Sequence, residues 1–187
     1  MKEVISAAIG GIDLPEAQPC LDSLIKNLRK SGPTKISKSV DEPAVRCMAV
    51  WAIGRLASTT TIKKASKILI DALGDPFFKV RASACSSIAQ FGVAENTAQT
   101  YEFELLSQQV IPILVRLLRD GQLNKQTVAE TIVLMGAYGE QTLVNIYGKE
   151  PECNLKLRIC IVRALALANV SNASIDFVIE MLFRAAR

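Results

Sequence analysis

The sequence of 187 residues contains no histidine. Imidazole is the base of Ser-His-Asp and Cys-His nucleophiles, and it is a ligand of mixed Cys/His zinc sites and of histidine-bound iron sites. None of these sites can form here. The glycine-rich phosphate-binding patterns G-x-x-x-x-G-K-S/T and G-x-G-x-x-G are missing as well. We therefore predict no catalytic residue, no metal site and no cofactor.

Long hydrophobic runs are also missing. The longest stretch without a charged side chain, residues 82–94, has thirteen residues, whereas about 18 to 20 apolar residues are needed to cross a bilayer. The N-terminal sequence MKEVISAAIGGIDLPE carries Glu3 and has no extended apolar core, which is unlike a secretory signal. Neither secretion nor membrane insertion is predicted.

Cysteine is present, but its pattern favours neither disulfides nor metal binding. Five is an odd number, the closest two are seven residues apart, and no C-x-x-C occurs. A reactive thiol would need a cationic, exposed setting. The pattern is typical of reduced, buried thiols, so we predict a cytoplasmic location with the nucleus as the alternative. The five residues are Cys20, Cys47, Cys85, Cys153 and Cys160.

Helical periodicity runs through almost the whole chain, half of which is hydrophobic. Leu21, Leu24, Ile25 and Leu28 follow the i, i+3, i+4, i+7 spacing of an amphipathic helix. Glycine and proline separate such runs, and no segment alternates with period two for long enough to form a strand. The sequence predicts an all-α fold. Helices are expected over residues 21–29, 61–73, 105–119 and 141–147, each followed by a second helix.

Those second helices form an internal repeat. The stretch Asp41–Ala57 recurs as Asp75–Gly92, in which Val80 and Arg81 take the places of Val45 and Arg46 at a spacing of 35. Looser copies occupy residues 124–139, aligned through Gly136 with Gly54, and residues 155–168. A helical hairpin of this size cannot bury its apolar face alone, so neighbouring hairpins are expected to stack.

The repeated pattern D-x-x-x-V-R-x-x-A-x-x-A-I-G resembles the HEAT repeat, with the armadillo repeat as the nearest alternative. The resemblance implies a right-handed α-α superhelix (solenoid) of about four to five hairpins in a single domain, residues 1–187. The repeats are expected near residues 15–57, 60–92, 100–138 and 139–169, with a terminal half-repeat at 172–187.

Aspartate and arginine recur at equivalent places in the first two copies, as Asp41, Arg46, Asp75 and Arg81. The arginines could meet an acidic partner. Alternatively, each aspartate caps a helix and each arginine pairs with a turn aspartate of the same or the next repeat. The resemblance to HEAT-like proteins favours the second interpretation, a structural ladder.

Basic residues concentrate in the first part of the chain. Residues 1–81 hold 13 Lys plus Arg against 8 Asp plus Glu, and residues 82–187 hold 9 against 10. Lys63, Lys64 and Lys67 are therefore candidates for contact with an acidic protein surface, unless they form only a solvated face. Nucleic acid is the less favoured anion, because aromatic residues make up only 5% of the chain.

Trp51, Arg55 and Arg163 lie on the predicted second helices of their repeats. The resemblance places these helices on the concave side, where an exposed indole would anchor a partner. Packing against the next repeat is the alternative for Trp51.

A non-catalytic protein-protein interaction scaffold, complete or part of a larger assembly, is the function that the resemblance favours. A HEAT-like enzyme or auxiliary lyase without an identifiable site and a HEAT-like nucleic-acid-binding protein are the alternatives. Residues 172–187 form a further amphipathic helix, which we expect to mediate self-association or to continue into a further repeat, unless it caps the array. Its apolar face comprises Ile175, Val178, Ile179, Leu182 and Phe183.

Overall fold

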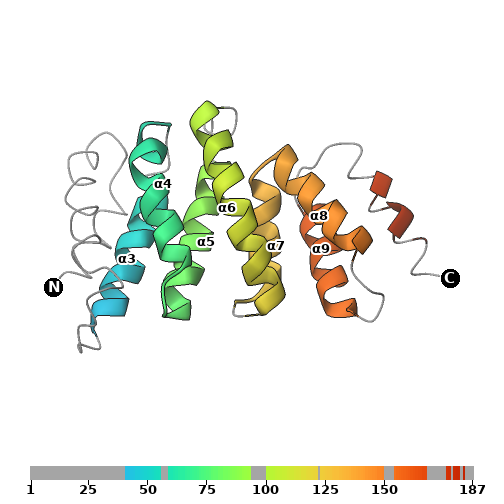
Figure 1. The fold of residues 1–187 in the computed structure, drawn as a ribbon, viewed down its shortest axis with the longest axis horizontal. Coiled ribbons are helices and arrows are strands. Elements are labelled where there is room, and N and C mark those ends of the chain that lie inside the picture. The colour runs from blue at the N-terminus through green and yellow to red at the C-terminus, as the bar shows by residue number, and fades with distance from the viewer. Residues whose placement is uncertain are drawn as a thin grey trace. The chain divides into compact units, whose positions relative to one another are not determined.

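The computed structural model describes residues 41–55, 59–93, 100–121, 123–149 and 154–167, together with 176–177, 179–181 and 183. Regular structure in these ranges is helical, which confirms the predicted all-α class. The helix predicted over residues 21–29 lies outside the described residues. The helices are α3 (Asp41–Arg55), α4 (Thr59–Leu73), α5 (Phe78–Val93), α6 (Tyr101–Asp120), α7 (Lys125–Leu134), α8 (Ala137–Lys149) and α9 (Leu155–Leu167) (Figure 1).

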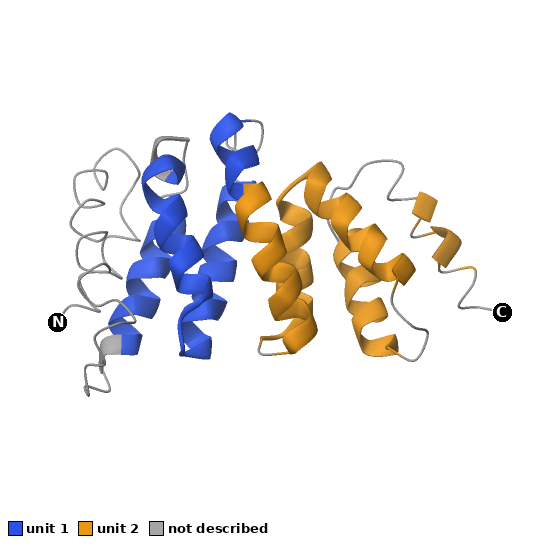
Figure 2. Cartoon of the chain, viewed as in Figure 1, with its two compact units in different colours: residues 1–106 blue, residues 107–187 orange. Residues whose placement is uncertain are grey.

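The chain divides into two compact units, residues 1–106 and residues 107–187 (Figure 2). Helix α6 begins in unit 1 and ends in unit 2. The repeat boundaries and the single-domain assignment stay predictions.

In unit 1, α3 and α5 lie side by side and α4 packs against both (Figure 1). The reason lies in the spacing of apolar residues on α4, where Ile62, Ala65 and Leu69 form one fully buried stripe. The same core receives Ile53 from α3 and Ile88 from α5, both without exposed surface. Burial of this apolar surface is the main stabilising contribution to the unit.

The contact between α3 and α5 is unusually close at Gly54. A Cβ atom at this position would lie only 2.6 Å from the Cα atom of Ser87. The hydroxyl of Ser87 donates to the carbonyl oxygen of Val50 at 2.7 Å, and that of Ser83 donates to the carbonyl oxygen of Cys47 at 3.0 Å. Small and hydroxyl-bearing side chains thus allow the two helices to approach and satisfy their polar groups.

Unit 2 repeats the arrangement, with α7 beside α9 and α8 packed against both. Val128 and Ile132 of α7 meet Leu143 of α8 and Ile161 of α9 in its core, all fully buried. The Ser107 hydroxyl of α6, in the same unit, donates to the carbonyl oxygen of Met135 at 3.3 Å.

The predicted second helix over residues 124–139 is too long. Helix α7 ends at Leu134, because Gly136 has a φ of 81° and breaks the helix before α8 begins. Gly136 is therefore not equivalent to Gly54, which lies inside α3. Asn124 fixes the other end of α7, since its side-chain oxygen accepts a hydrogen bond from the Gln126 backbone N–H at 2.9 Å.

The described side chains after α9 differ in burial. The Phe177 ring packs edge-on against Tyr147 of α8, with 5.3 Å between the ring centroids, and Met181 is buried. Ile179 and Phe183 of the predicted apolar face are exposed. The other members of that face, Ile175, Val178 and Leu182, lie outside the described side chains.

Candidate functional site

An ion pair joins α3 to the turn between α4 and α5. The Arg46 Nε atom donates to Asp75 Oδ2 at 2.8 Å, and Arg46 Nη2 donates to Asp75 Oδ1 at 3.2 Å. Both residues are buried, with 8% of Arg46 and 5% of Asp75 exposed. The same carboxylate accepts the Phe77 backbone N–H at 2.9 Å, close to the beginning of α5. The Asp75 carboxylate thereby connects α3 to the turn and to the beginning of α5.

Arg81 holds the same turn from the other side. Its Nη1 atom donates to the carbonyl oxygens of Asp75 at 2.7 Å and Pro76 at 2.9 Å. Arg81 thus bonds to the turn aspartate through its carbonyl oxygen, not through its carboxylate. Asp41 begins α3, but its side chain lies outside the description.

We expect Arg81→Ala to lower the free energy of unfolding of unit 1 by roughly 1 to 3 kcal/mol, since it removes two hydrogen bonds from a charged donor and leaves two turn carbonyls unpaired. Urea unfolding measures the loss. An Arg81→Ala protein of unchanged stability that no longer binds its partner would instead assign Arg81 to the binding surface.

The exposed side of α3 carries Met48, Trp51 and Arg55, which follow the i, i+3, i+7 spacing of one helix side. Trp51 is 39% exposed, whereas Ala49 and Ile53 on the opposite side are buried. Trp51 therefore keeps part of its surface open to solvent.

The exposed side of α5 continues that of α3. Both helices turn their apolar sides toward α4, and Ser83 and Ser87 of α5 face α3. The remaining side of α5 exposes Ser86 and Gln90, which take the places of Trp51 and Arg55 in the 35-residue repeat. We call the combined surface the α3–α5 face; its residues are Met48, Trp51, Arg55, Ser86, Gln90 and Val93.

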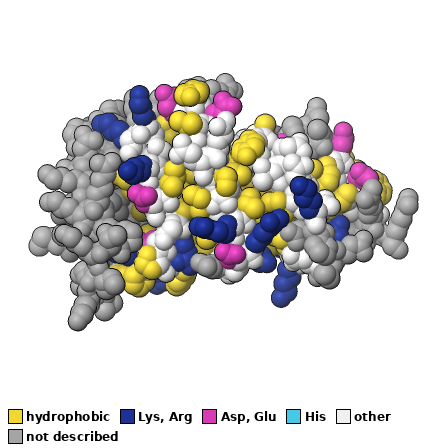
Figure 3. Space-filling view, in the orientation of Figure 1, with side chains coloured by type: hydrophobic (Ala, Val, Ile, Leu, Met, Phe, Trp, Pro, Cys, Tyr) yellow, Lys and Arg dark blue, Asp and Glu magenta, His cyan; other side chains and the backbone are white. Residues whose placement is uncertain are grey.

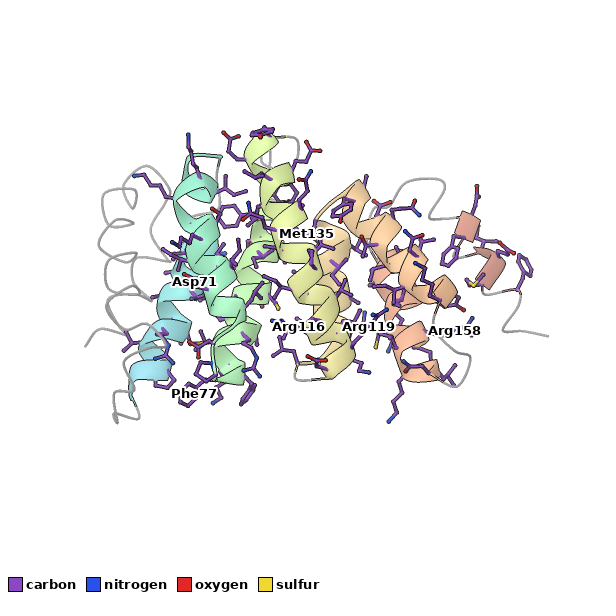
Figure 4. All side chains as sticks on the ribbon, in the orientation of Figure 1. Asp71, Phe77, Arg116, Arg119, Met135 and Arg158 are labelled. Atoms are coloured by element: carbon purple, nitrogen blue, oxygen red, sulfur yellow. The ribbon has the colours of Figure 1, made fainter. Side chains whose placement is uncertain are left out.

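Within unit 1 the predicted partner-binding residues lie on two different sides. Lys63, Lys64 and Lys67 are exposed with Asp71 on the side of α4 that points away from α3 and α5. Figure 3 views this side, where dark blue side chains lie over α4, and Figure 4 labels Asp71 there. Arg163 is exposed on α9 in unit 2.

The described cysteines differ in burial. Cys85 is fully buried in α5, and desolvation by burial raises the pKa of its thiol to about 12. Cys47 and Cys160 are half-buried free thiols, and Cys47 Sγ lies 3.7 Å from the Lys79 carbonyl oxygen. Among the described residues, no three side chains of the kinds that bind metals lie together.

The raised pKa of Cys85 makes the stability of unit 1 depend on alkaline pH. From about pH 9 to about 12 the unfolded thiol ionises while the folded thiol keeps its proton, so the stability present below pH 9 is progressively lost. We expect a loss of roughly 1.4 kcal/mol per pH unit from this group. The difference in urea midpoint between wild type and Cys85→Ala measures it; a difference that is independent of pH across this window would contradict it.

Comparison with known protein families confirms the family that the internal repeat indicated. The family model described as HEAT repeats matches residues 34–132, more than half of the chain. The chain belongs to the HEAT-repeat family. Its fold is an all-α HEAT-repeat solenoid. Neither the search of curated proteins nor that of solved structures gives a significant match.

Two features of this HEAT-repeat protein were not predicted from its sequence. One is the close approach at Gly54, for which the only signal was the run of small residues in both helices. The other is the exposure of Phe77 and Phe78 at the turn before α5, signalled by two phenylalanines directly after Asp-Pro. No helix within the described ranges is long and apolar enough to cross a membrane.

Proposed function

We propose that this HEAT-repeat protein is a non-catalytic interaction scaffold that holds another protein on its α3–α5 face. Stacked helical repeats typically present extended binding surfaces. The observation that carries the proposal is the exposure of Trp51, the only tryptophan in the chain, between Met48 and Arg55.

Tryptophan, methionine and arginine are enriched in the cores of protein interfaces, and tryptophan and arginine dominate their binding energy. Trp51 stands on a rigid helix, so little side-chain entropy is lost when a partner covers it. Ser86 and Gln90 on the neighbouring α5 supply a polar rim that suits a protein partner.

The partner that we propose has an acidic surface. Residues 1–81, which include the α3 side of this face, hold 13 Lys plus Arg against 8 Asp plus Glu. Lys63, Lys64 and Lys67 on the far side of α4 give a second basic surface for a partner that wraps around the unit.

Quantitative affinity capture with matched variants tests the proposal. The wild-type chain is compared with the double variant Met48→Ser, Trp51→Ser and with Tyr138→Ser, which removes an exposed aromatic side chain from α8 in unit 2. We expect the double variant to lose partners that the wild type and Tyr138→Ser both retain. If the same partners remain at the same level on all three proteins, the α3–α5 face is not the binding site.

A second copy of the chain is a further partner, favoured by the exposure of Ile179 and Phe183. We propose that these side chains meet the same side chains of another copy. Light scattering should show association of the wild type and a monomer for Ile179→Glu, Phe183→Glu. A wild type that remains monomeric over a wide range of concentrations would overturn this proposal.

A further inference from the structure

Three consecutive apolar residues are exposed at the turn between α4 and α5. Pro76 is exposed, and Phe77 and Phe78 keep 50% and 58% of their surface in contact with solvent. We call Pro76, Phe77 and Phe78 the Phe turn; Figure 4 labels Phe77 in unit 1. An exposed run of this kind is unfavourable in a soluble domain unless it has a function.

The backbone of the Phe turn is held rigidly. Both oxygens of the Asp75 carboxylate are engaged, by Arg46 and by the Phe77 N–H, and Arg81 holds the carbonyl oxygens of Asp75 and Pro76. The Arg46 Cζ atom also lies over the Phe77 ring, 5.5 Å from the ring centroid. The turn backbone and the Phe77 ring are therefore held in place, which lowers the entropy that binding costs.

The surroundings of the Phe turn are positively charged. Lys79, the residue after Phe78, is exposed. The Arg81 guanidinium donates to two carbonyl oxygens, and no carboxylate among the described residues pairs with its charge. The nearby carboxylate, Asp75, is buried and already paired with Arg46. A carboxylate brought by a partner would find a favourable potential beside the two rings.

We infer that the Phe turn is a second docking surface, and that it takes an acidic segment of a partner protein whose apolar side chains cover the Phe77 and Phe78 rings while its carboxylates face Lys79. The inference rests on the proposed function, because it adds an anchor for the same partner. Phe78 and Ser86 both belong to α5, about 12 Å apart along its axis.

An acidic protein segment suits this surface better than an anionic membrane does. Membrane binding through charge needs several basic residues near the surface, whereas the exposed basic residue directly after the Phe turn is Lys79 alone. The rigid turn also favours a partner with a matching shape, which a fluid bilayer does not supply.

Selection of random peptides displayed on phage against the whole chain tests the inference. We expect the enriched peptides to carry several Asp or Glu residues beside aliphatic or aromatic ones. A synthetic peptide of the enriched sequence should bind Phe78→Ser at least about tenfold more weakly than wild type, and Lys79→Glu more weakly as well. Phe78→Ser leaves the contact between Phe77 and Arg46 in place, and Tyr138→Ser is the control that should bind as wild type does.

Failure to enrich acidic peptides, or binding that Phe78→Ser leaves unchanged, would overturn the inference. If binding of the peptide depends on Trp51 and not on Phe78, the inference fails while the proposed function stands. If binding depends on neither residue, both are contradicted.

In a second experiment, the chain is mixed with vesicles of phosphatidylcholine and phosphatidylserine in equal parts. Recruitment of wild type but not of Phe78→Ser to these vesicles would assign the Phe turn to a membrane and overturn the inference as well.

Discussion

Replacing Asp75 by alanine is expected to lower the free energy of unfolding of unit 1 by about 4 kcal/mol, because removal of one member of a buried ion pair leaves the other as an uncompensated buried charge. Arg46 would lose both of its bonds to the carboxylate, and the Phe77 N–H would lose its acceptor. Urea unfolding followed by the emission of Trp51 measures the change in the same unit.

Two matched variants separate this effect from a general loss of charge. Asp71→Ala removes an exposed carboxylate from α4 and should leave unfolding nearly unchanged. The double variant Arg46→Met, Asp75→Ala removes both charges and should be more stable than Asp75→Ala alone. An Asp75→Ala protein as stable as Asp71→Ala would show that the ion pair does not hold the turn.

Gly54→Ala is expected to destabilise unit 1 by about 2 kcal/mol. The new methyl group would lie 2.6 Å from the Ser87 Cα atom, so α3 and α5 have to move apart, and overpacking of this kind typically costs about 1 to 3 kcal/mol or more. The better helix propensity of alanine recovers only about 1 kcal/mol. The hydrogen bond from Ser87 to the Val50 carbonyl is also weakened as the helices separate.

The control for Gly54→Ala is the same substitution at Gly148, which is exposed in α8 and has no atom within 4 Å of the added methyl group. At Gly148 the substitution changes only the helix propensity, so we expect the free energy of unfolding to rise by up to about 1 kcal/mol. Circular dichroism during urea unfolding reports both variants. Equal effects of the two substitutions would mean that the contact between α3 and α5 is not tight.

The fold class could be predicted because the signals that determine it are local. Helical periodicity in α4, with Ile62, Ala65 and Leu69 on one side, is a property of neighbouring residues. The repeat of Val45 and Arg46 as Val80 and Arg81 then indicated the stacking of equivalent helices. The helix ends were less predictable, since Gly136 ends α7 through a backbone conformation that glycine permits but does not require.

The candidate site could be predicted only in part, because exposure depends on contacts between distant segments. The sequence pattern gave two alternatives for Trp51, and its exposed fraction of 39% follows from the packing of α3 against its neighbours, which the pattern does not contain. The helical spacing of Lys63 and Lys67 was clear, but their separation from Trp51 follows from the packing of α4 on α3 and α5. The exposure of Phe77 and Phe78 could not be predicted, because the sequence around them is typical of the beginning of a helix.

The emission of Trp51 in the presence of the captured partner tests the interaction surface most directly, because it is the only tryptophan of the chain and lies at the centre of the α3–α5 face. A partner without tryptophan, or one whose tryptophans are replaced, is added until binding saturates. We predict a shift of the emission to shorter wavelength and weaker quenching by acrylamide, as the indole loses contact with water. Saturated binding that leaves both the wavelength and the quenching unchanged would contradict the assignment of this face as the binding site.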